Sequence, residues 1–522
     1  MDVSNMSIRL PDWTPLVEDH LATGEPIVNL TGNGEGVYDA IFVGGGAAGR
    51  FGSSYLKAMG GRPLVIDRWP FLGGSCPHQA CLPHHLFSEA AALLDRERWL
   101  AGQLWFRPAG EVKASILELV ELFRRGRVAG HAFMNWQTKT QLGVEYLLNT
   151  SARVLDPHTV QAGERIFRAR NVVLGLGARQ KPIDPAGCPG GDLPGVYDFA
   201  TLVETLDYEP RRCVIIGGSK VAVEYGSFFQ AAGCPTTIFT RNPLLRTKTM
   251  HHVDEDARRY VLDGMRKRGV EIYEGGVPLE IKGTDRVEAV VARGPDGETF
   301  HIECDFVFNG TGERPNSEPA QDWLGVEVGP TGEVVVDRRM RTSVPGVYAV
   351  GDLIGPPMEM FKARKTGVTA ARNVMGEPAE FDFTEYPDFL HTTYEMSWVG
   401  LAEEEARARG YDVMVIQMPP KGLDHDDILL PCAEGTMLYA FLKPGLSGFQ
   451  KCVVDRATRR ILGFHHVGYG AKDAFQYLDL LLRRPEGITI DEMGQLNELF
   501  LNPEHFIQLC RLRAGGAELV DI

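Results

Sequence analysis

Two glycine-rich turns, each lying between a short apolar strand and a helix, constrain the fold of this chain more than any other feature. The first follows the apolar run at residues 38–43 and reads Gly44-Gly45-Gly46-Ala47-Ala48-Gly49, a G-x-G-x-x-G pattern. A second apolar run at 63–66 ends in Asp67, eighteen residues after Gly49. Strand, glycines, helix, strand and terminal acid together are typical of a dinucleotide-binding unit, whereas the glycines alone are weak evidence.

The residues of this unit have distinct expected roles. Gly44 permits the tight turn, and Gly46 lets the backbone approach a pyrophosphate at the helix N-terminus. Asp67 is placed to accept hydrogen bonds from ribose hydroxyls. A glycine-rich loop without a ligand is the alternative interpretation.

A second copy of the unit occupies residues 212–240. An apolar run at 213–216 leads into Gly217-Gly218-Ser219, where serine replaces the middle glycine, and a second strand follows at 236–240. No acid ends that strand, and Arg241 and Arg246 follow it. Arginines accommodate a 2′-phosphate, so NADP(H) is favoured over NAD(H), with a solvated basic turn as the alternative. The residues expected to hold this coenzyme are Gly217, Ser219, Ala222, Glu224, Arg241 and Arg246.

Bulk composition narrows the function classes. The net charge of −15 argues against nucleic-acid binding, and the length of 522 residues allows three or four domains. The nine cysteines include one close pair, which is unlike a disulfide scaffold and fits a reducing cytoplasm. The N-terminal residues resemble no signal peptide, and no apolar run is long enough to cross a membrane. We expect no metal site.

That close pair, Cys76 and Cys81, lies in the stretch GGSCPHQACLP at 73–83. Two thiols five positions apart, shortly after a nucleotide fingerprint, would form a two-electron relay beside a flavin. Metal binding or simple burial is the alternative, although no second pair lies nearby.

The order of these features predicts an α/β fold with two Rossmann-like dinucleotide-binding domains and a C-terminal α+β domain. We expect an N-terminal extension at 1–36. The first nucleotide domain is expected at 37–182 and 305–376, and the second at 183–304. From about residue 377 the sequence pattern changes to alternating strands followed by helices. Residues 377–522 contain no nucleotide fingerprint, which favours a separate domain there.

These motifs together resemble the pyridine nucleotide-disulfide oxidoreductases, over about residues 38–515. The resemblance implies a homodimer whose active sites are shared between subunits. It implies that NADPH reduces FAD, which reduces the Cys76–Cys81 disulfide. Cys81, at a helix start near the flavin, is expected to be the thiolate, and Cys76 to attack an external sulfur. The FAD residues implied are Gly44, Gly46, Gly49, Asp67, Gly351 and Asp352.

The chain departs from that family at its proton donor. Where disulfide reductases of the family carry His-x4-Glu, this chain has Phe500 and His505. Phenylalanine cannot transfer a proton. Its presence would suit an enzyme that forms a carbanion and must not protonate it. A degenerate reductase is the alternative. A second departure is His84, which stands in place of the lysine beside the flavin and is expected to pair with Glu224 as a weaker, titratable partner.

Several stretches resemble one branch of the family, the 2-ketopropyl-coenzyme M oxidoreductase/carboxylases. They are CPHQACLPHHLF at 76–87, HAFMNWQ at 131–137, EMFKARKTG at 359–367 and FLNPEHFIQ at 500–508. The resemblance implies that Cys76 attacks the coenzyme M sulfur of a thioether, leaving the enolate of acetone. CO₂ then converts the enolate to acetoacetate, and Cys81 releases coenzyme M.

The same resemblance implies a set of substrate residues. Arg50 and Arg364 are expected to hold the sulfonate, with a surface position or, for Arg50, an FAD contact as alternatives. Met134 and Phe500 would keep the pocket apolar. The remaining candidates are His505 and Gln508 for the enolate oxygen and His78 and His131 for CO₂ or carboxylate, the latter two also explicable as structural histidines.

Two other functions stay open on the sequence. One is an NADPH-dependent disulfide or metal-ion reductase with an altered acid/base site, although the C-terminal tail lacks the cysteine pair of mercuric reductase. The other is a non-catalytic flavoprotein that acts as a binding subunit. Intact cysteines and fingerprints argue against the second.

Overall fold

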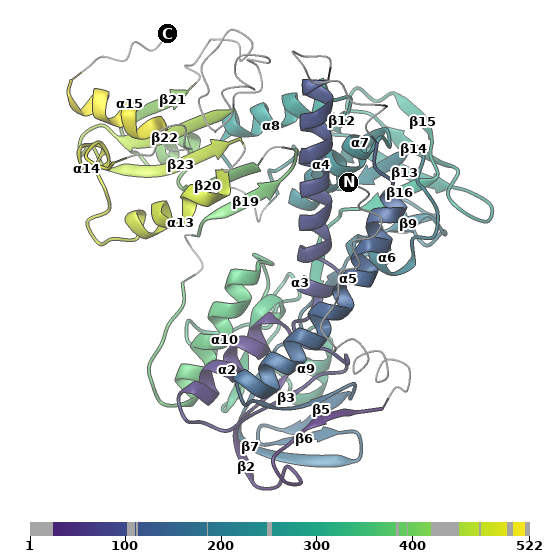
Figure 1. The fold of residues 1–522 in the computed structure, drawn as a ribbon, viewed down its shortest axis with the longest axis vertical. Coiled ribbons are helices and arrows are strands. Elements are labelled where there is room, and N and C mark those ends of the chain that lie inside the picture. Colours follow the sequence, from purple (N-terminus) through teal and green to yellow (C-terminus); the bar gives the residue numbers. More distant parts are fainter. Residues whose placement is uncertain are drawn as a thin grey trace.

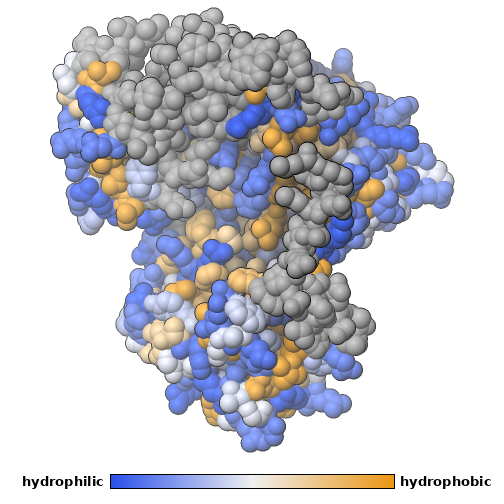
Figure 2. Space-filling view, viewed as in Figure 1, coloured by the Kyte–Doolittle hydropathy of each residue, from blue (hydrophilic) through white to orange (hydrophobic). Residues whose placement is uncertain are grey.

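The computed structural model describes residues 25–101, 110, 113–184, 186–247, 253–382, 386–393, 395–418, 448–468, 471–497 and 505–516. Within these residues, the three larger sheets and their helices form the lower, upper right and upper left parts of Figure 1. On the face shown in Figure 2, hydrophilic residues predominate and hydrophobic ones are scattered. Among the described residues, no helix has the length and apolarity needed to span a membrane.

The first sheet carries the first glycine-rich turn. Its strands run in the order β1-β4-β3-β2-β7-β6-β5, with β18 paired to β7. The central pairs β2–β3, β3–β4, β2–β7 and β7–β18 are parallel, as the predicted nucleotide domain requires. The strands are β1 (Ile27–Asn29), β2 (Val37–Val43), β3 (Pro63–Ile66), β4 (Glu145–Leu148), β5 (Ala152–Asp156), β6 (Thr159–Ala162), β7 (Arg165–Leu174) and β18 (Val347–Ala349).

Two helices cross closely against this sheet (Figure 1). They are α2 (Ala47–Ala58), which starts at the glycine turn, and α10 (Met360–Val374). A Cβ atom on Gly52 of α2 would lie 2.7 Å from the backbone oxygen of Gly367 in α10. The two glycines therefore allow the helices to approach, which brings residues 359–364 beside the first nucleotide turn. Smaller elements are α9 (Glu318–Leu324) and the 3₁₀ turn η3 (Gly351–Ile354).

The second sheet is all parallel, in the order β12-β11-β10-β16-β9. Its strands are β9 (Val196–Tyr197), β10 (Cys213–Ile216), β11 (Thr236–Thr240), β12 (Glu271–Glu274) and β16 (Phe306–Asn309). Because β16 pairs with β10, this strand belongs to the second nucleotide domain, and the boundary that we expected at 304/305 falls too early. The associated helices are α6 (Phe199–Thr205), α7 (Lys220–Ala232) and α8 (Glu255–Lys267).

Two small sheets accompany the nucleotide domains. A three-stranded antiparallel sheet contains β13 (Val277–Lys282), β14 (Ala289–Arg293) and β15 (Thr299–Glu303). A two-stranded ribbon joins β8 (Ala178–Gln180) to β17 (Glu313–Pro315), where the chain passes between the domains.

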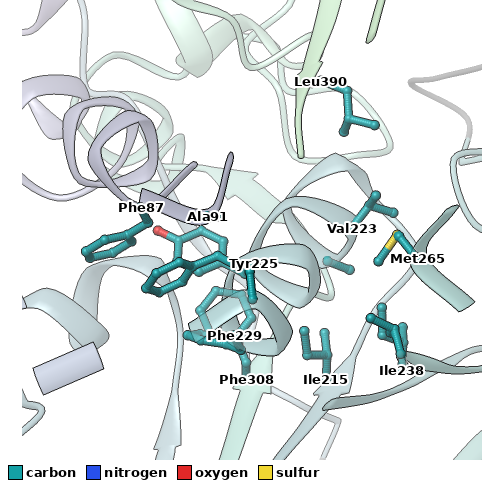
Figure 3. Packing of buried hydrophobic residues seen from close by; sticks show 14 of the residues in the cluster. Phe87, Ala91, Ile215, Val223, Tyr225, Phe229, Ile238, Met265, Phe308 and Leu390 are labelled. Atoms are coloured by element: carbon teal, nitrogen blue, oxygen red, sulfur yellow. The ribbon is translucent and has the colours of Figure 1, made fainter. Parts of the chain in front are cut away.

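Helix α4 (Cys81–Leu100) links the two nucleotide domains (Figure 1). Phe87 and Ala91 on α4 belong to one buried cluster with Tyr225 and Phe229 of α7 (Figure 3). The rings of Phe87 and Phe228 stack with centroids 4.7 Å apart. The helix that begins at Cys81 is therefore packed onto the second nucleotide domain by aromatic contacts. Before the chain returns to the first sheet, α5 (Ile116–Trp136) and the π-helical turn η2 (Gln137–Gln141) follow α4.

The C-terminal part forms an antiparallel sheet in the order β19-β20-β23-β22-β21, with its own hydrophobic core. This arrangement agrees with the predicted α+β domain. Its strands are β19 (Asp388–His391), β20 (Glu395–Gly400), β21 (Val413–Met418), β22 (Phe449–Asp455) and β23 (Ile461–Val467). Its helices are α11 (Glu403–Ala408), α13 (Ala471–Leu482), α14 (Ile490–Met493) and α15 (His505–Ala514).

Candidate active site around Cys76 and Cys81

The first glycine turn has the shape that a dinucleotide pyrophosphate needs. Gly44 has φ +107°, and a Cβ atom there would lie 2.2 Å from the oxygen of Gly175. A Cβ on Gly49 would lie 1.9 Å from the oxygen of Gly44. At Gly46 the nearest neighbour of a Cβ would be 3.7 Å away, so this position stays open to a ligand. These residues fit FAD, as the pattern predicts.

Asp67 supports the turn itself. Its Oδ2 accepts a hydrogen bond of 2.5 Å from the amide of Gly45, and its Oδ1 accepts one of 2.9 Å from the amide of Trp69. Burial raises the pKa of this carboxyl, while the two amides oppose the shift. A carboxylate has about four acceptor positions, so Asp67 keeps capacity for ribose hydroxyls beside this structural role.

The loop that carries the two cysteines lies directly on the glycine turn. Gly46 and Gly73 form a parallel β-bridge, and the amide of Gly73 donates to the oxygen of Gly45 at 2.8 Å. Gly74 has φ +68°, and a Cβ there would lie 2.8 Å from the Cα of Gly46. Backbone contact between glycines thus fixes the cysteine loop beside the nucleotide site.

Cys76 lies in the short helix α3 (Ser75–His78), and Cys81 is the first residue of α4. Both side chains are partly buried. A hydrogen bond between them lowers the pKa of Cys76, an effect that burial opposes and the charge of Arg364 assists. The same hydrogen bond, together with burial, raises the pKa of Cys81. The protein's own groups thus shift the two pKa values in opposite directions, whereas the prediction of a thiolate at Cys81 also depends on the flavin beside it.

Arg50 and Arg364, separated by more than 300 positions, lie together in the fold. Both guanidinium groups face the ring of Phe51, at 5.9 Å and 4.5 Å from its centroid. Burial and the charge of Arg364 lower the pKa of Arg50. Arg50 is only 9% exposed, which rules out a surface position, and it donates to Thr138 Oγ1 at 2.9 Å and to Gln137. The Nε of Arg364 is buried and has no protein partner.

His78 and His131 also come together, in contact with Phe71. The three ring centroids are 3.8 Å apart in each pair. Burial lowers the pKa of His78 to about 3 and that of His131 to about 2. His78 Nε2 lies 3.0 Å from the oxygen of Leu72, whereas its Nδ1 and both ring nitrogens of His131 are buried without a partner. Two neutral imidazoles with unused polar atoms therefore lie beside the cysteine loop.

Further candidates line the same region. Met134 is partly buried, and its sulfur would be 2.6 Å from a Cβ on Gly73. The amide of Gly351 is held by Thr366 Oγ1 at 3.0 Å. Burial raises the pKa of Asp352, while the charge of Lys362 opposes this shift. Asp352 also acts on the charge of both cysteines, so it lies near them, as an FAD contact would.

The second glycine turn repeats the geometry of the first. Gly217 has φ +149°, and a Cβ there would lie 2.1 Å from the oxygen of Gly310. Ser219 is the N-cap residue of α7, and Ala222 packs 3.3 Å from a Cβ position on Gly310. Arg241 follows β11 and is exposed, whereas Arg246 is engaged by Glu255 and Glu404 at 2.8 Å and 2.5 Å. A 2′-phosphate would therefore compete with these two carboxylates for Arg246, whereas Arg241 is open to solvent.

The side chain of Glu224 contacts α4, the helix that begins at Cys81. Its Oε2 lies 3.2 Å from Nε2 of His84, and its Oε1 accepts the amide of His391 at 2.8 Å. Burial lowers the pKa of His84 to about 3 and raises that of Glu224 to about 7. The contact between His84 and Glu224 that the sequence predicts is therefore present, and the lowered pKa of His84 favours its neutral imidazole at neutral pH.

Lys220 was not among the residues that the sequence singled out. Its Nζ lies 2.6 Å from both Glu359 Oε1 and Asp388 Oδ1, and these charges raise its pKa although burial opposes them. The charge of Glu359 acts on both cysteines, and the next residue, Met360, has its Sδ 3.4 Å from Cys76 Sγ. The local sequence around Lys220 does not predict that its partners are Glu359 and Asp388, because these residues are more than 100 positions away.

Some predicted residues lie beyond what the structure describes. Phe500 falls outside the described residues. His505 and Gln508 lie in α15, which agrees with a helix there, but their side chains also fall outside the described part. Among the described residues, no group of three or more His, Cys, Asp or Glu side chains is arranged to hold a metal ion.

Residues 38–367 match the family described as "Pyridine nucleotide-disulphide oxidoreductase", and residues 386–497 match its dimerisation domain. Dihydrolipoyl dehydrogenase of Thermus scotoductus is 27% identical over 467 residues, which cover 88% of this chain and 93% of the relative. Mercuric reductase of Staphylococcus aureus is 24% identical over 491 residues, covering 92% and 83%. Members of this family use FAD and NAD(P)H, and the dimerisation domain supports a homodimer. This chain, an oxidoreductase that acts on sulfur groups, belongs to the pyridine nucleotide-disulphide oxidoreductase family.

Proposed function

We propose that this enzyme cleaves the thioether of 2-ketopropyl-coenzyme M with its dithiol and carboxylates the resulting enolate to acetoacetate. The observation that carries the proposal is the pair Arg50 and Arg364, two guanidinium groups facing one ring with the Nε of Arg364 unpartnered. A buried pair of like charges is stable only with a counter-ion, and a sulfonate supplies one. The charge of Arg364 reaches Cys76, so an anion held there brings its attached sulfur close to the attacking thiol.

FAD and NADPH belong to this proposal. Gly44, Gly46, Gly49 and Asp67 would hold the FAD, with Asp352 on the other side, and Gly217 and Ser219 would hold the NADPH pyrophosphate. When bound, the two cofactors supply the electron pair that converts the Cys76–Cys81 disulfide to one thiolate and one thiol.

The chain's own residues then carry out sulfur chemistry that balances. The Cys76 thiolate attacks the thioether sulfur; a sulfur–sulfur bond forms, the carbon–sulfur bond breaks, and the electron pair leaves on the acetone enolate. The enolate carbon bonds to CO₂ and gives acetoacetate. Cys81 then attacks the Sγ of Cys76 and gives its proton to the departing sulfur, which releases coenzyme M as a thiol and restores the Cys76–Cys81 disulfide.

Proton supply decides whether acetone or acetoacetate forms. The dithiol carries one proton after reduction, and the opposite pKa shifts favour its position on Cys81 rather than on Cys76. His78 and His131, with pKa values of about 3 and 2, are neutral and hold no acidic proton at neutral pH. Their free nitrogens suit CO₂ or a carboxylate. Phe500 and Met134 would keep water out, and His505 and Gln508 would stabilise the enolate oxygen.

An alternative is an NADPH-dependent disulfide or metal-ion reductase with an altered acid/base site. The comparisons favour this coarser function more directly, because the relatives named above are a dihydrolipoyl dehydrogenase and a mercuric reductase. Both functions use the same cofactors and the same dithiol, so the substrate distinguishes them.

The deciding experiment supplies purified holoenzyme with NADPH, 2-ketopropyl-coenzyme M and labelled bicarbonate. Labelled acetoacetate, formed with one equivalent of coenzyme M per NADPH, is the expected result. Rapid reduction of glutathione disulfide or Hg²⁺ without label in any product would favour the alternative. In the variant Phe500→His, we expect acetone to increase at the expense of acetoacetate, and an unchanged product ratio would contradict the proton-exclusion argument.

A further inference from the structure

Arg246, expected at the 2′-phosphate of the coenzyme, is bound to a carboxylate of the C-terminal domain. Its Nη2 donates to Glu255 Oε2 at 2.8 Å, at the start of α8, and to Glu404 Oε1 at 2.5 Å, in α11. Figure 1 shows α8 of the second nucleotide domain against the C-terminal sheet. The contact therefore joins the coenzyme loop to another domain.

A buried ion cluster beneath this contact fixes the position of Glu404. Asp254, which is completely buried, caps α8, binds Lys451 Nζ at 3.0 Å and accepts the amide of Glu403 at 3.1 Å. Lys451 also lies 2.7 Å from Glu403 Oε2 and 2.7 Å from Asp256 Oδ2. Because Asp254 and Glu403 are locked together, the residues that follow them, Glu255 and Glu404, converge on Arg246.

The two carboxylates around Arg246 are not equivalent. Glu255 has two further cationic partners: Arg258, whose Nε lies at 2.9 Å, and Arg259, whose Nε lies at 3.1 Å. The side chain of Glu404 is 44% exposed, so water solvates it when Arg246 leaves. A phosphate dianion would thus displace Glu404 with little penalty, while Glu255 stays paired.

We propose that Glu404 competes with the 2′-phosphate of NADP(H) for Arg246, which makes Glu404 a determinant of coenzyme affinity. The inference rests on NADPH as the coenzyme in the proposed function. Glu404 weakens the hold on the phosphorylated coenzyme and leaves the affinity for a coenzyme without 2′-phosphate unchanged. Coenzyme binding then breaks the Arg246–Glu404 contact, while Asp254 and Lys451 still hold Glu403 of α11.

The test compares 2′,5′-ADP with 5′-AMP, which differ in the 2′-phosphate alone, by titration calorimetry on the full-length holoenzyme. In Glu404→Gln we expect the Kd of 2′,5′-ADP to fall about twofold to fivefold, the range for one exposed ion pair. The Kd of 5′-AMP should stay the same. Glu405→Gln is the matched control, because Glu405 pairs with Arg409 at 2.6 Å within the same helix, and it should change neither ligand.

A second pair of variants tests the role of Arg246 itself. Arg246→Gln should weaken 2′,5′-ADP binding, and the double variant with Glu404→Gln should show no gain over it. An unchanged Kd of 2′,5′-ADP in Glu404→Gln, or an equal change for both ligands, overturns the inference. These titrations do not involve the thioether, so a missing acetoacetate product would refute the proposed reaction and leave this result standing.

Discussion

The thiols of Cys76 and Cys81 are hydrogen-bonded to each other, and this contact lowers the pKa of Cys76 while it raises that of Cys81. These directions favour the proton on Cys81, as the donor, and the charge on Cys76. In the proposed reaction, Cys76, in contact with Met360, is the nucleophile, and Cys81, at the start of α4, is the resolving thiol.

We expect iodoacetamide to modify Cys76 before Cys81 in the reduced enzyme. In Cys81→Ala the donor is lost, so the pH at which Cys76 is half-reactive should rise by about one to two units, the equivalent of one hydrogen bond to a charged group. Alkylation rates across pH, followed by peptide mass spectrometry, measure the shift. Faster labelling of Cys81, or a lower midpoint in the variant, would contradict the assignment.

The arginine pair should govern binding of the anionic tail. We expect Arg364→Met to weaken binding of 2-mercaptoethanesulfonate about tenfold or more, because a charge-assisted hydrogen bond contributes roughly 1.5–3 kcal/mol. The same variant should raise the pKa of Cys76, since the charge of Arg364 lowers it. Arg338→Ala, at an exposed pair with Asp382, is the control and should alter neither value. Equal effects in both variants would remove the sulfonate assignment.

Asp95 and Arg268 join α4 to the end of α8 through a buried pair, with Nε–Oδ1 and Nη2–Oδ2 distances of 2.6 Å and 2.8 Å. Asp95→Ala leaves a buried guanidinium without its carboxylate, which should lower the free energy of unfolding by about 3–5 kcal/mol. Asp263→Ala breaks an exposed pair with Arg266 and should cost about 0–1 kcal/mol. Urea unfolding curves give both values, and similar losses would show that burial does not matter here.

His78 and His131 predict an acid-sensitive stability. Their folded pKa values of about 3 and 2 lie below the unfolded value of about 6.5, so the unfolded chain binds more protons in between. Their contribution is complete above pH 6.5 and is lost as the pH falls toward 3. Replacing His131 by Phe, which keeps the stack on Phe71, should flatten the decline between pH 6.5 and 4 in thermal unfolding. A decline as steep as in the wild type would show that other groups cause it.

The sequence predicts the nucleotide domains and the dithiol because both depend on local pattern. A strand, a glycine turn and a helix are adjacent in the chain, and Cys76 and Cys81 lie five positions apart. The C-terminal α+β domain is likewise predicted from the local pattern of strands and helices. The boundary at 304/305 was wrong because β16 joins β10 from 90 residues away, a pairing that no local pattern reveals.

Contacts between side chains that are distant in the sequence were harder to predict. The proximity of Arg50 to Arg364, and of His78 to His131, followed from family resemblance and not from residue spacing. The Lys220 cluster and the Arg246–Glu404 contact went unpredicted, since each joins separate domains through single charged side chains. The sequence predicts the pairing of His84 with Glu224, but the burial that lowers the pKa of His84 depends on tertiary packing.

The bridge between Gly46 and Gly73, with Gly74 beside it, sets how far the sulfur chemistry lies from the nucleotide turn. A methyl group at position 74 would overlap the Cα of Gly46 at 2.8 Å and push the whole cysteine loop outward. Such a change would leave Cys76 and Cys81 in the chain, but it would increase the distance between these thiols and a flavin at the nucleotide turn. The distance between the cysteine loop and the nucleotide turn therefore depends on glycine at these positions, because no larger side chain permits so close an approach.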